Sequence, residues 1–237
     1  MLLSCLRFGI ENLSPKEIRN KKVIEVGSYD VNGSLRHFVE SLAPAEYIGV
    51  DILMGPGVDV ICSAEELEKK FGLESFDVVI ATELLEHVRD WRKAVSNLKR
   101  VCRLGGIILI TSPSRGFGYH GYPSDFWRYE KKDMERIFSD CQILALERNP
   151  STPGVFLKCQ KPAQFTENNL FDYQLYSIVV GRKIKKLKEQ DFHSLRFLCF
   201  SLLGRIVTSF PIKFFMDMKH KKEKKKANHF LIKLSQS

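Results

Sequence analysis

Short apolar runs alternate with amphipathic segments through the first 160 residues of the chain. Runs rich in β-branched residues, several of them closed by a glycine or a carboxylate, predict strands. Between these runs, apolar residues spaced three and four apart predict helices, the first of which opens with Ser14 and Pro15. The predicted strands cover residues 22–27, 47–51, 58–61, 76–81 and 107–110, and the predicted helices cover 15–20, 34–42, 63–71, 91–102 and 131–138.

The order of these elements predicts the fold class. Strands that alternate with helices are typical of a doubly wound, mostly parallel, Rossmann-like α/β sheet, which binds its ligand at the carboxyl ends of the strands. Two later strands, 143–146 and 155–159, follow each other without a helix between them, so we expect an antiparallel hairpin at one edge of the sheet. We also expect Gly105 and Gly106 to end the helix that precedes the strand at 107–110.

Two turns, at the ends of the first two predicted strands, carry candidate binding residues. Glu25, Gly27 and Gly33 lie at the end of the first strand and in the turn after it, where glycine permits positive φ and a close approach of ligand to backbone. The next helix begins there and offers free N–H groups. Asp51 closes the second strand, where a carboxylate can accept hydrogen bonds from both hydroxyls of a ribose. An ordinary turn residue is the alternative interpretation of Asp51.

At this point the chain resembles the class I, Rossmann-like methyltransferases that depend on S-adenosylmethionine. The resemblance rests on four segments that occur in the family's order: Glu-Val-Gly at 25–27 with Gly33, Gly-Val-Asp at 49–51, the strand FDVVIATELLEHV at 76–88, and LKRVCRLGGIILITSP at 98–113. It implies a methyltransferase domain over residues 1–162 with S-adenosylmethionine as cofactor. A nicotinamide-dependent oxidoreductase is the competing class, but its G-x-G-x-x-G fingerprint has glycine where this chain has Tyr29.

The resemblance also implies roles for individual residues. The methionine half of the cofactor would contact Glu25, Gly27, Ser28 and Gly33. Asp51 would bind the ribose, and Ser63 and Ala64 would flank the adenine. Thr82 and Glu83 would face the methyl-bearing end of the cofactor and the acceptor. In one respect the chain departs from the family, whose loop usually has two glycines separated by one residue. Here Tyr29 and Asp30 intervene, which leaves the roles of residues 28–32 open.

The segment 114–129 is irregular, with several glycines and aromatic residues, and it follows the fifth strand, so we expect it to cover the acceptor end of the cleft. His120 is the candidate catalytic base, and Asp125 could orient it or act directly; a structural or substrate-orienting role for His120 is the alternative. Neither residue has further ligands at a recognisable spacing, so we expect no metal. The residues expected to contact the acceptor are Tyr122, Trp127, Arg128 and Tyr129.

Alternatives remain for two of these side chains and for the acceptor. Arg128 could bind an anionic acceptor or pair with Asp125, and His87 is expected to be structural. Nucleic-acid base methyltransferases usually have Asn/Asp-Pro-Pro-aromatic after the fourth strand, where this chain has Thr-Glu-Leu-Leu at 82–85. We therefore expect methylation of an oxygen or nitrogen of a small molecule, sugar-containing or lipid-linked. A non-catalytic cofactor-binding or membrane-associated scaffold is the alternative function.

The net charge of +9 is concentrated at the end of the chain. From Lys161 onward there are sixteen basic and six acidic residues, whereas the preceding residues have twenty-one and twenty-two. We expect residues 163–237 to form a basic, partly helical extension, with an amphipathic helix at 199–210 and a lysine cluster at 219–226. Residues 195–226 could contact an anionic membrane surface or form a homodimer. Alternatively, the helix packs on the catalytic domain and the lysine cluster is solvated. The absence of aromatic or Gly/Arg interleaving disfavours nucleic acid.

Cysteine usage and hydropathy bear on the cellular location. The six cysteines show no metal-ligand spacing, which is typical of buried thiols in a reducing compartment. There is no run of eighteen uncharged apolar residues, so we expect no transmembrane helix. No basic leader precedes Cys5, so we expect no signal peptide. These observations favour a cytoplasmic protein, with attachment to the inner face of the membrane left open.

Overall fold

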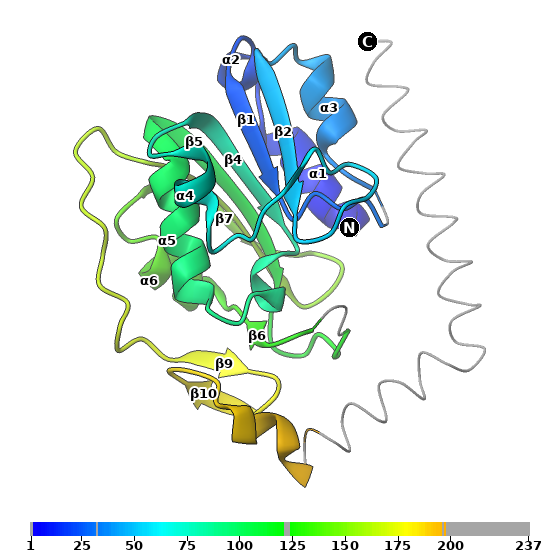
Figure 1. Cartoon of the computed structure of the whole chain (residues 1–237), viewed down its shortest axis with the longest axis vertical. Helices are drawn as coiled ribbons and strands as arrows, with labels where there is room; N and C mark the ends of the chain where they lie inside the picture. Colours follow the sequence, from blue (N-terminus) through cyan, green and yellow to red (C-terminus); the bar gives the residue numbers. More distant parts are fainter. Residues whose placement is uncertain (1, 32, 121–123, 196, 198–237) are drawn as a thin grey trace.

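The computed structural model describes residues 2–31, 33–120, 124–195 and 197. Its centre is a twisted seven-stranded sheet (Figure 1). In sheet order, the strands are β3 (Val60–Ile61), β2 (Glu46–Asp51), β1 (Lys22–Val26), β4 (Phe76–Thr82), β5 (Cys102–Pro113), β8 (Gly154–Gln160) and β7 (Gln142–Arg148).

Parallel pairing joins the first five strands of this sheet. β1 pairs with β2 and β4, β2 with β3, and β4 with β5, so the carboxyl ends of β1, β2 and β4 open at the same edge. β8 lies between β5 and β7 and is antiparallel to both. The predicted doubly wound α/β sheet with an antiparallel hairpin at its edge is therefore confirmed.

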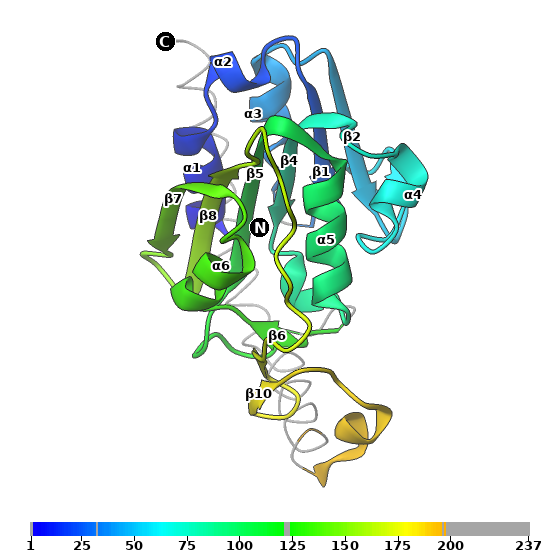
Figure 2. The same cartoon turned by 90° about the vertical axis from the view of Figure 1, so that its left-hand side faces the viewer.

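Helices cover both faces of the sheet, as the two views in Figures 1 and 2 show. One face carries α1 (Leu3–Asn12), α2 (Pro15–Ile18) and α3 (Arg36–Ser41), and the other carries α4 (Leu67–Phe71), α5 (Trp91–Val101) and α6 (Lys131–Ile137). Because successive side chains of a strand point to opposite faces, neighbouring residues enter different cores. Val23 of β1 packs with the α1 side and Ile24 with the α5 side, and Val78 and Val79 of β4 divide in the same way.

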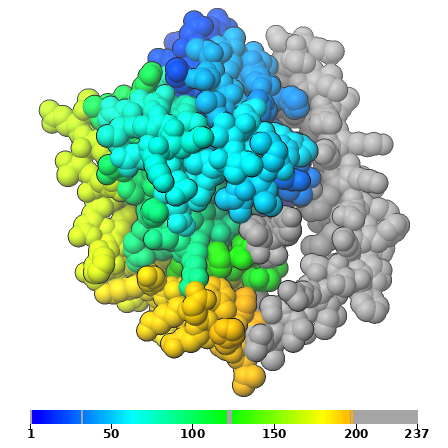
Figure 3. Space-filling view, in the orientation of Figure 1, coloured from blue at the N-terminus to red at the C-terminus, as the bar shows by residue number. Residues whose placement is uncertain are grey.

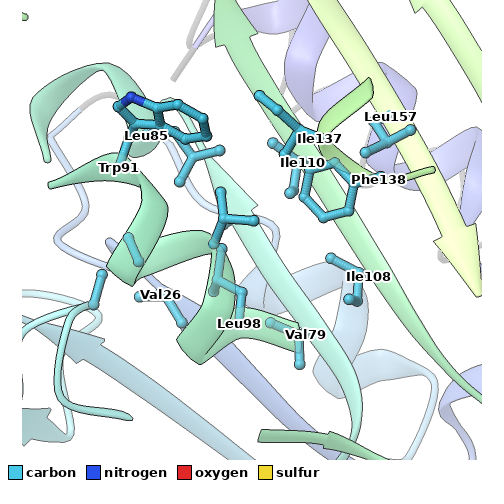
Figure 4. Packing of buried hydrophobic residues seen from close by; sticks show 14 of the residues in the cluster. Val26, Val79, Leu85, Trp91, Leu98, Ile108, Ile110, Ile137, Phe138 and Leu157 are labelled. Carbon is cyan, nitrogen blue, oxygen red and sulfur yellow. The ribbon is translucent and has the colours of Figure 1, made fainter. Parts of the chain in front are cut away.

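Helix α5 contributes most of the apolar contacts on its side of the sheet. Its Trp91 and Leu98 project toward β4 and β5 and pack in the same cluster as Val79, Ile108 and Ile110 (Figure 4). All these side chains are fully buried, and burial of each is worth about 1.5–3 kcal/mol. The Asp90 carboxylate caps the helix by accepting a hydrogen bond from the N–H of Lys93.

Two local expectations differ from the structure. Helix α1 was not predicted from the sequence, yet it buries Cys5, Leu6 and Phe8 against the sheet. Gly105 and Gly106 do not end α5, which stops at Val101; they lie inside β5. There, Gly105 has φ of 76°, and the register of β5 against β4 shifts beside it, so these glycines accommodate an irregularity in the strand.

Residues 161–195, which follow β8, pack back onto the domain. β9 (Leu175–Ser177) and β10 (Arg182–Ile184) form a second sheet with β6 (Trp127–Arg128), followed by the 3-10 helix η2 (Glu189–His193). Residues 175–195, in gold, lie directly against the green body in Figure 3. The described part of the expected extension contains these two short strands and the 3-10 helix η2, and β9 pairs with the open edge of β6. The segments predicted at 199–210 and 219–226 lie outside the described residues.

Side chains also connect this segment to α5. The Arg92 guanidinium donates hydrogen bonds to the carbonyls of Leu170, Tyr173 and Lys185. These contacts cross the boundary placed at residue 162, which stays a prediction. None of the described helices is long and apolar enough to cross a membrane.

A buried lysine makes a second connection of this kind. Lys99 of α5 is fully buried, and its ammonium lies 2.7 Å from the Asp140 carboxylate, which is only 3% exposed. The same ammonium donates to the carbonyl of Ile137 and to the side chain of Asn168. A cation this deep is tolerated because its donors are satisfied and its charge is paired.

Replacing Lys99 with Met should lower the free energy of unfolding by about 3–5 kcal/mol, because the Asp140 carboxylate then stays buried without its cation. Urea denaturation measures this difference. The double variant Lys99→Met/Asp140→Asn should recover much of the loss, since a neutral amide needs no counter-charge. Arg7→Ala, which breaks an exposed pair with Glu11, is the control and should cost less than about 1 kcal/mol. A loss in K99M no larger than in this control would contradict the interpretation.

Candidate functional site

A pocket of about 460 Å³ lies where the carboxyl ends of β1, β2 and β4 meet. Parallel strands bring their ends to one edge, so turns far apart in the sequence converge there. The sequence-predicted residues that line this pocket are Glu25, Gly27, Ser28, Gly33, Asp51, Ser63, Ala64, Thr82 and Glu83. The structure thus brings together every residue that the sequence assigned to the cofactor.

The backbone at Gly27 requires glycine. Its φ is 79°, and a Cβ atom there would lie 3.0 Å from the side chain of Leu84, across the pocket wall. The Gly27 N–H donates to the carbonyl of Val50 at the end of β2, which fixes the turn. The loop continues to Gly33, at φ 113°, whose N–H donates to the Asp30 carboxylate at 2.6 Å. The absence of a side chain at residue 27 keeps the backbone accessible from the pocket.

The Glu25 carboxylate is buried at the end of β1 and held by two hydroxyl groups. Ser34 donates a hydrogen bond of 3.0 Å to it, and Tyr47 donates a second, short one. Burial raises the pKa of Glu25, against the opposing effect of these two donors. The side chain therefore forms a fixed, polar wall of the pocket.

Asp51 retains capacity for further hydrogen bonds. Among the described residues, its carboxylate accepts hydrogen bonds from the backbone N–H groups of Tyr29 and Leu53, both at 3.3 Å, and its side chain is partly exposed at the pocket. Ionised carboxylates have about four acceptor positions. Ser63 and Ala64 lie beyond β3 and line the same pocket.

Glu83 follows β4 in a left-handed conformation, with φ of 52°. Its N–H donates to the carbonyl and hydroxyl oxygens of Thr111, and its carboxylate accepts from the Sγ of Cys5 at 3.4 Å. Burial raises the pKa of Glu83 to about 7, and the nearby Glu86 carboxylate adds to the shift. Cys5 comes from α1 and was not expected at this site; the five described cysteines are all buried free thiols.

A group of buried polar side chains adjoins the acceptor end of the pocket. The Asp125 carboxylate lies 3.0 Å from Nδ1 of His120 and forms a two-point ion pair with Arg128. Nε2 of His120 lies 3.8 Å from Oε1 of Glu86, and Nε2 of His87 lies 3.7 Å from the same oxygen. Of these residues His87 lines the pocket.

The electrostatics of this group bear on the candidate base. Burial alone would lower the pKa of His120, but the hydrogen bond that its ring donates to the Asp125 carboxylate and the nearby Glu86 carboxylate outweigh this effect and raise the pKa to about 10. The pKa of Asp125 lies well below its usual range, because Arg128 and His120 overcome the effect of burial. The assignment of His120 as the catalytic base stays a prediction. Of the two roles considered for Arg128, the pair with Asp125 is the one observed.

The aromatic residues expected to contact the acceptor lie elsewhere. Trp127 and Tyr129 are buried, and their polar atoms donate to the carbonyls of Val88 and Leu85 respectively. Neither they nor Arg128 lines the pocket, so their assignment to acceptor binding is corrected: an aromatic side chain with a satisfied polar atom is a core residue here. Tyr122 lies outside the described residues. Phe126 and Ser124 line the pocket instead.

Sequence reasoning also missed the turn after β4. Glu86 and His87 belong to the 3-10 helix η1 (Leu85–His87), which follows the strand directly. Their closeness to Glu83 along one short turn was visible in the sequence. Their meeting with His120 was not, because it depends on how the segment after β5 folds back.

Two curated proteins named as methyltransferases are similar to this chain. A phthiotriol/phenolphthiotriol dimycocerosates methyltransferase from Mycobacterium ulcerans (strain Agy99) is 25% identical over 200 residues, which is 78% of this chain and 69% of that protein. A phosphatidylethanolamine N-methyltransferase from Cereibacter sphaeroides is 30% identical over 116 residues, 41% of this chain. The second match spans about half, 53%, of that relative.

Solved structures share the fold at low sequence identity. A 1,6-didemethyltoxoflavin-N1-methyltransferase from Burkholderia thailandensis, with 1,6-didemethyltoxoflavin and S-adenosylhomocysteine bound, has a TM-score of 0.53 at 13% identity and covers 67% of this chain and 78% of that one. The YcgJ protein from Bacillus subtilis has a TM-score of 0.50 at 16% identity, over 67% of this chain and 98% of that one.

A family model described as a methyltransferase domain matches residues 6–148. The matched segment is more than half of the chain and contains the strand ends that form the pocket. The chain therefore belongs to the methyltransferase domain family and is an enzyme that takes its methyl group from S-adenosylmethionine.

Proposed function

We propose that this enzyme methylates an oxygen or nitrogen of a small molecule, sugar-containing or lipid-linked. One observation carries the proposal: the turns after β1, β2 and β4 form a single pocket of about 460 Å³ that combines donor-binding residues with an open acceptor end. This volume is within the range of about 300–1,000 Å³ usual for small-molecule sites.

The pocket residues fit the methyl donor. Gly27 lines the pocket in a positive-φ turn that a residue with a Cβ would strain and crowd against Leu84, so its backbone borders the pocket directly. The Asp51 carboxylate has acceptor capacity left for two ribose hydroxyls. Ser63 and Ala64 supply a small-residue wall that suits the flat adenine ring.

The chain's contribution to the reaction is alignment. When bound, the donor supplies an electrophilic methyl group on a sulfonium. Leu84, Val88 and Phe126 line the acceptor end with apolar surface, which excludes water, and Thr82 and Glu83 border it at the end of β4. In-line displacement is accelerated mainly by holding the reacting atoms in line. Asp125 then serves as a positioning residue, since it accepts a hydrogen bond from the N–H of His120 and pairs with Arg128, next to Phe126 in the chain.

The names of the relatives support a lipid-linked acceptor. Both curated relatives are named as methyltransferases of lipid molecules, one of them an N-methyltransferase. Their identities of 25% and 30% leave the acceptor and the acceptor atom of this enzyme as a proposal.

Asp51→Ala should weaken binding of S-adenosylmethionine by roughly ten- to a hundredfold, because hydrogen bonds to a charged group are worth about 1.5–3 kcal/mol. Isothermal titration calorimetry of the full chain measures the dissociation constant. Asp172→Ala is the matched control, since Asp172 is exposed and pairs only with Lys185 among the described contacts. Equal affinities of the Asp51 and Asp172 variants would remove Asp51 from the cofactor site.

The acceptor class is tested by transfer of label. The enzyme is incubated with methyl-labelled S-adenosylmethionine and either a lipid extract or a water-soluble extract of cells. We expect label in the lipid fraction, and less of it with Asp51→Ala than with Asp172→Ala. Tight binding of the donor without transfer to either fraction would contradict the proposal and favour a non-catalytic scaffold.

A lipid-linked acceptor also suggests a function for the basic extension at 163–237, because a lipid substrate lies at a membrane. We expect a cytoplasmic enzyme whose lysine cluster at 219–226 binds anionic membrane surfaces, each lysine being worth about 1 kcal/mol there. The full chain should float with vesicles that contain phosphatidylserine and less so at high salt. A version ending at Phe197, which retains the packed segment with β9 and β10, should stay in solution. If neither form floats with the vesicles, membrane contact is refuted. Size-exclusion chromatography of both forms tests the homodimer.

A further inference from the structure

The polar group beside the pocket contains a set of metal-ligand atoms. Within the part of the chain that the structure describes, one ligand atom from each of Glu86, His87 and His120 lies within 4.8 Å of the others. Glu86 is central, because its Oε1 lies 3.7 Å from Nε2 of His87 and 3.8 Å from Nε2 of His120. No other group of this kind is found among the described residues.

The two oxygens of the Glu86 carboxylate differ in their surroundings. The side chain is fully buried, and its Oε2 accepts a hydrogen bond from the Ser112 hydroxyl at 3.1 Å. Its Oε1 is buried, has no hydrogen-bond partner among the described residues, and lies within 4 Å of both imidazoles. A buried acceptor left unsatisfied costs about 1–3 kcal/mol, and more when it is charged. Such an atom is stabilised by a cation bound at this point.

Both histidines are already oriented as metal ligands. Nδ1 of His87 donates to the carbonyl of Ser124, and Nδ1 of His120 faces the Asp125 carboxylate at 3.0 Å. Arg128 in turn fixes Asp125. A ligating histidine generally donates its other ring N–H to a carbonyl or carboxylate, which sets the tautomer and leaves Nε2 to the metal. Here both Nε2 atoms turn toward the same carboxylate oxygen.

We propose that Glu86, His87 and His120 bind one divalent transition-metal ion of the Zn²⁺ type. Two imidazoles and one carboxylate are a ligand set of catalytic zinc sites, which leave a further position open. With metal–ligand bonds of about 2.0–2.1 Å, neighbouring ligands of a tetrahedral site lie roughly 3.3 Å apart. The observed separations of 3.7 and 3.8 Å are a few tenths of an ångström longer, which side-chain rotation can close. This proposal replaces the sequence-based expectation of no metal.

The place of the ion gives it a role in the reaction. His87 lines the pocket while Glu86 is buried behind it, so the open position faces the acceptor end. Resting here on the proposed function, we assign this position to a hydroxyl oxygen of the acceptor. Coordination lowers the pKa of such a hydroxyl. Its proton leaves to solvent, the oxygen forms a bond to the methyl carbon, and the carbon–sulfur bond breaks with its electron pair going to sulfur.

The site is tested on the full chain after removal of metal with a chelator. Zn²⁺ binding is measured by calorimetry, and Co²⁺ is the spectroscopic probe, because its visible absorption reports the coordination geometry. We expect binding of both ions, a low-symmetry Co²⁺ spectrum of four or five ligands, and a Zn²⁺-dependent rise in Tm. The chain has six histidines, and any of them can bind Zn²⁺ weakly. The site is therefore assigned by comparing variants and not by the number of ions bound.

His87→Asn and His120→Asn should each weaken Zn²⁺ binding at least about tenfold and remove the Co²⁺ spectrum. Asp125→Asn keeps the three ligands but changes the partner of both His120 and Arg128, and it should weaken Zn²⁺ binding by roughly ten- to a hundredfold. His37→Asn is the matched control, because His37 is exposed on α3, away from the cluster. Circular dichroism and Tm of the metal-free variants confirm that each is folded. Glu86→Gln is a third ligand variant. Because Glu86 is fully buried, its replacement also changes the packing of the core, so the two histidine variants are the primary test.

The outcomes separate this proposal from the proposed function. Absence of metal binding in the wild type, or equal affinities in His87→Asn, His120→Asn and His37→Asn, overturns the site and leaves an imidazole–carboxylate ion pair in its place. Calorimetry with S-adenosylmethionine on the metal-free protein tests the donor pocket independently. Metal binding that depends on His87 and His120 supports the site even if the donor pocket fails its own test.

Discussion

The pocket depends on the parallel pairing of β4 with β1 on one side and β5 on the other. Because these strands run in the same direction, the backbone leaves β1, β2 and β4 at one edge of the sheet, and the turns at Gly27, Asp51 and Glu83 meet there. Helices on both faces bury the sheet and keep the strand ends rigid. The antiparallel strand β8 closes the other side of β5 and takes no part in the pocket.

The second constraint is the set of buried charged side chains beside the pocket, Glu86, Asp125 and Arg128. Charged side chains at this depth are tolerated only when each is paired or hydrogen-bonded. Asp125 meets this requirement through Arg128 and His120, whereas Glu86 meets it with only one of its two oxygens. Trp127 and Tyr129 fasten the same segment to the turn after β4 through their own hydrogen bonds. Residues 125–129 are therefore held against the turn after β4, which carries Glu86 and His87.

Contacts with the residues after β8 stabilise this segment from the outside. β9 pairs with β6, and Arg92 of α5 is bonded to three carbonyls of the same segment. The described part of the basic extension thus supports the acceptor end directly. At the opposite side, α1 covers the sheet and places the Cys5 thiol against the Glu83 carboxylate. Residues from both ends of the described chain thereby influence groups that border the pocket.

The sequence by itself determined the strands, most helices and the residues of the donor pocket. Local patterns of apolar and polar residues give the elements and place Gly27 and Asp51 at strand ends, and the resemblance to class I methyltransferases implied the other residues of the pocket. Local patterns could not show that Trp127 and Tyr129 turn inward, that residues 163–195 add a strand to β6, or that Glu86, His87 and His120 meet. These features depend on contacts between segments distant in the chain. Such contacts form only where packing and the pairing of buried polar groups are satisfied together, and that condition belongs to the tertiary structure.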